Sequence, residues 1–182
     1  MFRRSWCVTA AVGLLFLGGC RPGGGTVSPT ADPLQTYGNA YRSVMMEYRT
    51  KVGALTSRPL PRRSPGMSAK EFRAQVAVQV EDMANAVTAT GAQMETLHPP
   101  PSLQEFHDSG RDFFRVFADG YRQWAAAIRT GTRREASRAS EAATESEIAA
   151  LQKILTTGEK AGMDLTEVKR TLAELQAEAA AK

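Results

Sequence analysis

The chain has 182 residues, a length that suits one ordinary domain, and its two cysteines are too few for a fold held together by several disulfides. Lys and Arg number 23 against 19 Asp and Glu, which gives a formal net charge of +4. Arg3 and Arg4 lie in the first four positions, so the rest of the chain has only a small basic excess, and we expect no nucleic-acid partner.

Residues 1–20 have the order of parts found in an export signal. Arg3 and Arg4 supply positive charge, and an apolar run from Trp6 to Leu17 follows, which is too short to span a membrane. The run ends in Leu17-Gly18-Gly19-Cys20, which resembles the lipobox of bacterial lipoproteins. The resemblance covers residues 1–20 only. It implies a signal peptide over residues 1–19, cleavage between Gly19 and Cys20, and a lipid on the sulfur of Cys20.

The same resemblance implies where the protein acts. The mature chain would begin at Cys20 and be exported, then anchored by acyl chains such as palmitate on the extracytoplasmic side of the cytoplasmic or the outer membrane. The membrane is therefore its first expected partner. Cys7 would leave with the signal and Cys20 would carry lipid, so no disulfide would form and helix packing must hold the fold.

Residues 20–31 are predicted to be a flexible linker, because they contain three consecutive glycines and almost no apolar side chains. The twelve residues from Cys20 to Asp32 reach at most about 40 Å. The folded part, predicted over residues 32–182, would therefore stay close to the membrane surface without being embedded in it.

Asp32 and Pro33 are typical of a helix start, and apolar residues recur at helical spacing from Leu34 to Leu55. Residues 57–66 contain three prolines and are predicted to be a stiff connection. This connection also contains three arginines and no acid. The arginines are Arg58, Arg62 and Arg63. They could contact anionic lipid head groups, but we favour a solvated loop because lipid-binding clusters usually have four to eight basic residues.

The second and third helices are predicted to form an antiparallel hairpin. Ser68 and Glu71 fit a capping box, and the helix that they start should run to about His98. Gly91 is a weak point in that helix, or a place where a neighbour approaches closely. Three prolines at 99–101 end the helix, and Ser102 with Glu105 fits a second capping box at the start of the next one.

An aromatic stripe dominates the third helix. It follows heptad-like spacing through Leu103, Phe106, Phe113, Phe117, Trp124 and Ile128, with Gly110 on the same face. The stripe could line a ligand pocket in which Gly110 leaves space. We favour the simpler interpretation that it is core, because aromatic residues at helical spacing usually pack against neighbouring helices.

Two further helices complete the pattern. Thr132 and Glu135 fit a third capping box, and the inward positions of the fourth helix are small at first, which should let it approach the aromatic stripe closely. Gly158 and Gly162 interrupt the pattern, and Asp164 restarts it. The short last helix either folds back on the bundle, as we favour, or extends as a partner-binding arm.

The sequence contains few residues that could form a metal site or a catalytic site. Glu95 and His98 have the Glu-x-x-His spacing of di-iron bundles, and the hairpin could bring His107 near them. Such sites need the motif twice with two further glutamates, so a ligand or metal site at Glu95, His98 and His107 is only an alternative. No phosphate-binding loop, haem-attachment motif or nucleophile elbow is present, and we predict no enzymatic activity and no cofactor.

The sequence therefore predicts an all-α protein, an antiparallel up-down bundle of four long helices plus a short C-terminal helix. We expect a lipid-anchored module of the cell envelope that binds or scaffolds an envelope protein partner through the exposed faces of its last two helices. The alternative is a bundle that binds a small ligand or a metal in the periplasm or the extracytoplasmic space.

Overall fold

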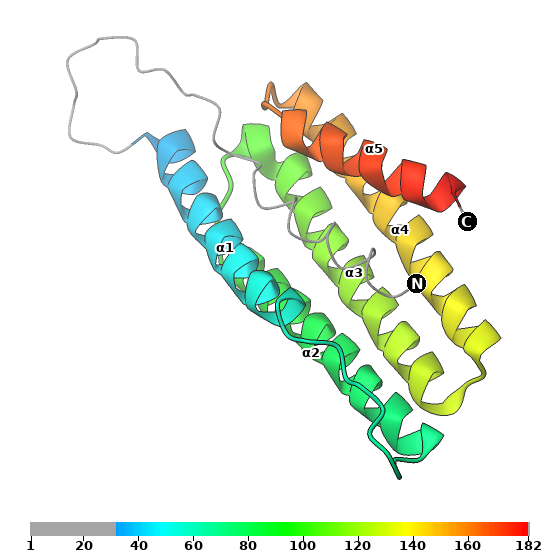
Figure 1. The fold of residues 1–182 in the computed structure, drawn as a ribbon. Helices are drawn as coiled ribbons and strands as arrows, with labels where there is room; N and C mark the ends of the chain where they lie inside the picture. Colours follow the sequence, from blue (N-terminus) through cyan, green and yellow to red (C-terminus); the bar gives the residue numbers. More distant parts are fainter. Residues whose placement is uncertain (1–31, 182) are drawn as a thin grey trace.

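The computed structural model describes residues 32–181, which form an all-α bundle (Figure 1). The helices are α1 (Pro33–Thr56), α2 (Ala69–Glu95), α3 (Gln104–Thr130), α4 (Arg133–Lys160) and α5 (Thr166–Ala180), with a short 3-10 turn, η2 (Pro101–Leu103), before α3. Within residues 32–181 no helix is long and apolar enough to cross a membrane. The predicted signal peptide and linker, including Gly19 and Cys20, lie outside the described residues. The predicted fold class is confirmed.

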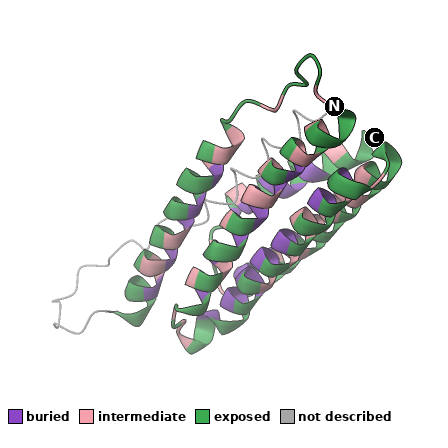
Figure 2. Ribbon diagram, turned by 90° about the horizontal axis from the view of Figure 1, so that it is seen from below, coloured by how far each residue is buried: buried purple, intermediate pink, exposed green. Residues whose placement is uncertain are grey.

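Helix α3 lies at the centre of the arrangement. It packs lengthwise between α2 and α4, while α1 packs against α2 and the short α5 packs against α4 (Figure 1). Successive helices run in opposite directions. Buried residues line the inward sides of the helices and exposed residues cover their outer sides (Figure 2). The last helix thus folds back on the bundle.

Two of the three predicted capping boxes are present. The Glu71 amide donates to the Ser68 hydroxyl over 3.1 Å, and the Ser68 amide donates to the Glu71 carboxylate over 2.8 Å. Thr132 and Glu135 form the same reciprocal pair at the start of α4. The box predicted at Ser102 is wrong, because η2 takes up Ser102 and Leu103 becomes the N-cap of α3, with no side-chain cap.

Two other sequence predictions need correction. Helix α2 ends at Glu95 rather than near His98, since Pro99 disfavours a helical backbone at the residue before it and the Thr96 amide already closes the last turn. Leu34 was placed on the apolar face of the first helix but is 45% exposed. It lies in the first turn of α1, before the first buried residue, Tyr37.

The aromatic stripe of α3 forms the core of the bundle. Phe106, Phe113 and Phe117 are buried, and they join one hydrophobic cluster with residues from α1, α2, α4 and α5. The ring of Phe114 meets the ring of Tyr48 from α1 edge to face, with 5.3 Å between the ring centroids. Edge-to-face contact is a favourable arrangement of aromatic rings, so these contacts stabilise the packing of α1 on α3.

Small residues let the helices approach α3 closely. A Cβ atom at Gly91 of α2 would lie 3.4 Å from the Cβ atom of Phe114, so the close approach expected at Gly91 is present. A Cβ atom at Gly120 of α3 would lie only 3.0 Å from the Cβ atom of Ala143. The small residues in the first half of α4 therefore allow it to pack against α3, as predicted.

Replacing a ring at the centre of the stripe should destabilise the whole bundle. We expect Phe113→Ala to lower the free energy of unfolding by about 3–5 kcal/mol, because Phe113 is fully buried and its loss leaves a cavity. Urea unfolding followed by circular dichroism measures the change. Val78→Ala is the control, since Val78 is 50% exposed and its truncation should change stability by less than about 0.5 kcal/mol. Equal effects of the two substitutions would contradict the central role of the stripe.

Candidate functional site

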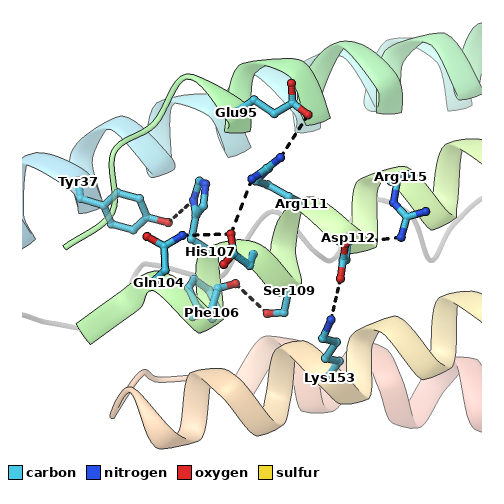
Figure 3. A network of polar contacts seen from close by, with 11 residues as sticks. Tyr37, Glu95, Gln104, Phe106, His107, Ser109, Arg111, Asp112, Arg115 and Lys153 are labelled. Atoms are coloured by element: carbon cyan, nitrogen blue, oxygen red, sulfur yellow. Dashed lines mark hydrogen bonds and ion pairs between the residues drawn. The ribbon is translucent and has the colours of Figure 1, made fainter. Parts of the chain in front are cut away.

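The residues predicted as a possible metal site do not form a ligand set. Glu95 and His98 are exposed, whereas His107 is buried. A guanidinium nitrogen of Arg111 lies 3.5 Å from the Glu95 carboxylate and forms an ion pair with it (Figure 3). Within residues 32–181 no group of three or more His, Cys, Asp or Glu side chains is placed to hold a metal ion.

His107 instead forms a buried polar contact between α3 and α1. Its Nδ1 lies 3.0 Å from the phenolic oxygen of Tyr37, a hydrogen bond whose donor depends on the imidazole tautomer (Figure 3). Burial lowers the pKa of His107, and the nearby Arg111 cation lowers it further against the opposing effect of Asp108. Burial also raises the pKa of Tyr37, so the phenol stays neutral. The pair therefore fixes α1 on α3 with neutral groups.

The arginines of the connection between α1 and α2 are exposed, and two of them contact the protein itself. An Nη atom of Arg58 lies 2.8 Å from the Asp82 carboxylate, and Nε of Arg63 donates to the carbonyl of Met67 over 2.9 Å. The connection lies at the opposite end of α1 from Asp32, about 36 Å along a helix of 24 residues. Lipid contact by Arg58, Arg62 and Arg63 would therefore place Asp32 up to about 36 Å from the membrane, within the greatest reach of about 40 Å of the predicted linker.

An open groove of about 470 Å³ runs along the outer surface between α2 and α3. We call it the α2/α3 groove. Its lining consists of Thr88, Gly91, Ala92, Glu95, Asp108, Arg111, Asp112, Phe114, Arg115, Ala118 and Arg122. Small residues make the hollow, because larger side chains at Gly91, Ala92 and Ala118 would occupy it. The groove differs from the pocket considered at the aromatic stripe, since the stripe faces inward.

Three arginines on one side of α3 border the groove. Arg122 donates to Thr88 over 2.6 Å and to Asp119 over 2.9 Å. Arg111 and Arg115 are held more loosely, since their guanidinium nitrogens lie 3.5 Å or more from their carboxylate partners (Figure 3). These two arginines thus keep hydrogen-bond donors that a bound group could accept.

Acidic side chains on both helices balance the arginines of the groove. The ammonium of Lys153 on α4 lies 2.6 Å from the Asp112 carboxylate, and this hydrogen bond holds the pKa of Asp112 below its usual value (Figure 3). Asp108 and Glu95 add two more carboxylates. The groove therefore presents both signs of charge above a small apolar floor. Its one hydroxyl, that of Thr88, already donates to the Ala84 carbonyl, so the arrangement suits binding more than nucleophilic chemistry.

Sequence reasoning missed this groove. The available signal was the spacing of Arg111, Arg115 and Arg122, which places these three arginines on one polar face of α3. The matching small residues of α2 lie on another helix. Only the register between α2 and α3 brings the two sets together, and that register depends on the hairpin and on side-chain packing.

The buried position of His107 generates a test of its protonation. We expect NMR titration to give His107 a pKa below 6.5, because burial disfavours the imidazolium. Since the folded pKa is lowered, the stabilisation from neutral His107 is complete above pH 6.5 and is lost progressively as the pH falls below that value. His98→Asn serves to assign the two imidazole signals. A pKa of His107 at or above 6.5 would contradict the buried position of its imidazole.

Comparisons with known proteins give no relative for this chain. No protein-family model matches it, and neither a curated protein nor a solved structure does so.

Proposed function

We propose that this protein is a lipid-anchored, non-enzymatic binding module of the bacterial cell envelope, and that the α2/α3 groove is its ligand surface. The groove itself carries the proposal, because it is a hollow of about 470 Å³ with charged groups on its wall. That volume falls in the range of ligand sites in proteins. Tethering a binding module to the membrane concentrates it at the envelope surface.

The proposed lipid anchor lies at the end of residues 1–20, and a short tether joins it to the start of the bundle. The lipobox-like sequence ends at Cys20, and the Asp32 carboxylate accepts a hydrogen bond from the Leu34 amide at the start of α1. Twelve residues separate the two points, which allows a reach of at most about 40 Å. A bundle on such a tether can present its groove to a ligand close to the membrane.

The chemistry of the groove favours an elongated ligand that carries both signs of charge, such as an envelope peptide segment. Arg111 and Arg115 can donate to carboxylates, while Glu95 and Asp108 can accept from cationic or amide groups. The apolar floor at Ala92 and Gly91 lets an extended chain lie close to the helices. A densely anionic polymer fits less well, because carboxylates stand beside the arginines along the wall.

The anchor can be tested by replacing the cysteine. We expect wild-type protein from native membranes to be detected by mass spectrometry without residues 1–19 and with acyl chains on Cys20, and to remain in the membrane fraction. Cys20→Ser should be recovered in the soluble extracytoplasmic fraction, because the lipid attachment atom is lost. Ser5→Ala within the leader is the control and should leave the protein in the membrane. An unmodified thiol at Cys20 in native material would contradict the anchor.

The ligand surface can be tested by photocrosslinking in intact cells. A photoreactive residue at Ala92, which is exposed in the groove, should yield a discrete covalent adduct because a bound ligand lies within its reach. The control is the same residue at Ala142, an exposed alanine of α4 outside the groove. Arg111→Ala combined with Arg115→Ala should reduce the adduct at position 92.

The crosslinking yields at positions 92 and 142 distinguish a ligand in the α2/α3 groove from a contact on the α4 surface. An adduct at position 142 but none at position 92 would contradict the groove and favour the α4 surface as the contact. Equal yields at both positions would also contradict a specific ligand surface in the groove.

A further inference from the structure

Two loops that lie far apart in the sequence come together at one end of the bundle. They are the connection between α1 and α2 and the turn between α3 and α4 (Figure 1). A small hydrophobic cluster joins the first half of α2, the end of α3 and the first half of α4 there, through residues such as Ala77, Ile128 and Ala136. The Gln79 side-chain amide donates to the Pro59 carbonyl over 3.0 Å, which holds the connection against α2.

We call this part of the molecule, residues 57–73 and 129–138, the basic end. It contains nine basic side chains and only two acidic ones, Glu71 and Glu135. Both glutamates belong to capping boxes, where their carboxylates accept hydrogen bonds from backbone amides. The nine basic side chains are all exposed: Arg58, Arg62, Arg63, Lys70, Arg73, Arg129, Arg133, Arg134 and Arg138.

Most of these cations have no carboxylate partner. The Arg58 guanidinium pairs with Asp82. That of Arg129 pairs with Glu81, with 2.6 Å between the nearest nitrogen and oxygen atoms. The other seven form no ion pair within the described part of the chain. Near the opposite end of the bundle, by contrast, three cations each pair with a glutamate. They are Lys160, Lys169 and Arg170.

The tertiary structure changes the interpretation of the arginines in the connection. Arg58, Arg62 and Arg63 by themselves are too few for a typical lipid-binding cluster, which has four to eight basic residues. The start of α2 and the start of α4 place further exposed cations at the same end, so the seven without a carboxylate partner fall in that range. Guanidinium groups donate readily to phosphate oxygens, and no carboxylate competes for these seven.

The predicted tether keeps a lipid surface within reach of the basic end. Asp32, where the tether joins the bundle, lies at the end where α3 begins, since Tyr37 of α1 contacts His107 of α3. Helix α3 has 27 residues, so its last turn lies about 40 Å from that end. A linker of twelve residues reaches at most about 40 Å and typically spans about 20 Å. The basic end can therefore touch the membrane without a fully extended tether when the bundle leans toward the surface.

We propose that the basic end is a second membrane contact, which binds the anionic lipid head groups of the same bilayer that holds the anchor. The reach of this contact rests on the proposed anchor, and charge complementarity supplies the attraction. Because the anchor confines the basic end near the bilayer, the second contact is effectively intramolecular and needs only a modest intrinsic affinity. Two contacts fix the orientation of the bundle relative to the membrane, which one point of attachment does not.

Binding of the full chain to lipid vesicles tests the proposal. All proteins in the experiment carry Cys20→Ser, so failure of the anchor cannot be mistaken for failure of the basic end. They also share residues 1–31, so differences in binding come from the folded part. We expect binding to vesicles that contain phosphatidylglycerol to be at least about tenfold tighter than binding to phosphatidylcholine vesicles. Added salt should weaken it, because salt screens the attraction.

The critical variant removes charge from both loops of the basic end. It combines Arg62→Gln with Arg133→Gln and Arg134→Gln, three exposed positions that take part in no ion pair within the described part of the chain. Each charge close to an anionic surface contributes about fivefold to binding, so the triple substitution should weaken binding to the anionic vesicles by about a hundredfold. Unchanged binding of this variant would overturn the proposal.

The matched control removes three positive charges near the opposite end and should change binding by less than about threefold. It combines Lys160→Gln, Lys169→Gln and Arg170→Gln. An equal loss in the control would overturn the proposal, because binding would then depend on net charge alone. Stronger binding to soluble polyphosphate than to vesicles of equal phosphate content would overturn it in favour of an anionic polymer. Clustering of anionic vesicles that carry the acylated wild type would also overturn it, because the basic end would then reach a second membrane.

Discussion

The fold depends on the packing of the aromatic face of α3. This helix touches α2 and α4 along its length, and its rings reach α1 through the contact between Phe114 and Tyr48. A single disrupted face would therefore loosen several helix pairs at once. Aromatic side chains bury the largest areas of any residues, so a helix that carries this many of them can organise a bundle without a disulfide.

The same small residues produce both the close packing and the groove. Gly91 lacks a side chain toward Phe114 on its inner side and leaves the floor of the α2/α3 groove open on its outer side. A Cβ atom there would lie 3.4 Å from the Cβ atom of Phe114, which is already contact distance, and a longer side chain would narrow the groove. One constraint on α2 thus connects the stability of the bundle to the shape of its candidate binding surface.

The charged groups of the protein fall into two energetic classes. Ion pairs such as Arg111 with Glu95 lie at the surface, where water screens them and each contributes little to stability. Glu147 on α4 is only 8% exposed, and burial raises the pKa of its carboxyl to about 8, because burial disfavours the charged form. The surface pairs can exchange partners with a ligand at small cost, whereas ionisation of Glu147 changes the stability of the packing around it.

The sequence by itself determined the all-α class, the number of long helices, two of the capping boxes and the inward face of α3. Periodicity and caps are local properties, so they can be read from neighbouring residues. The two wrong predictions, the capping box at Ser102 and the end of α2, were also local. Both lie beside the prolines at 99–101, and the exact residue at which a proline ends or starts a helix is difficult to predict.

Only the tertiary structure decided which polar residues meet. His107 had been considered as a metal ligand, yet its partner is Tyr37, which lies 70 residues earlier in the chain. Glu147 of α4 was not expected to be buried, yet it is only 8% exposed and lies close enough to Glu178 of α5 and Tyr48 of α1 to interact electrostatically with them. The groove likewise needs α2 and α3 in register. Such sites depend on the distances between helices, and helical spacing within one segment does not contain that information.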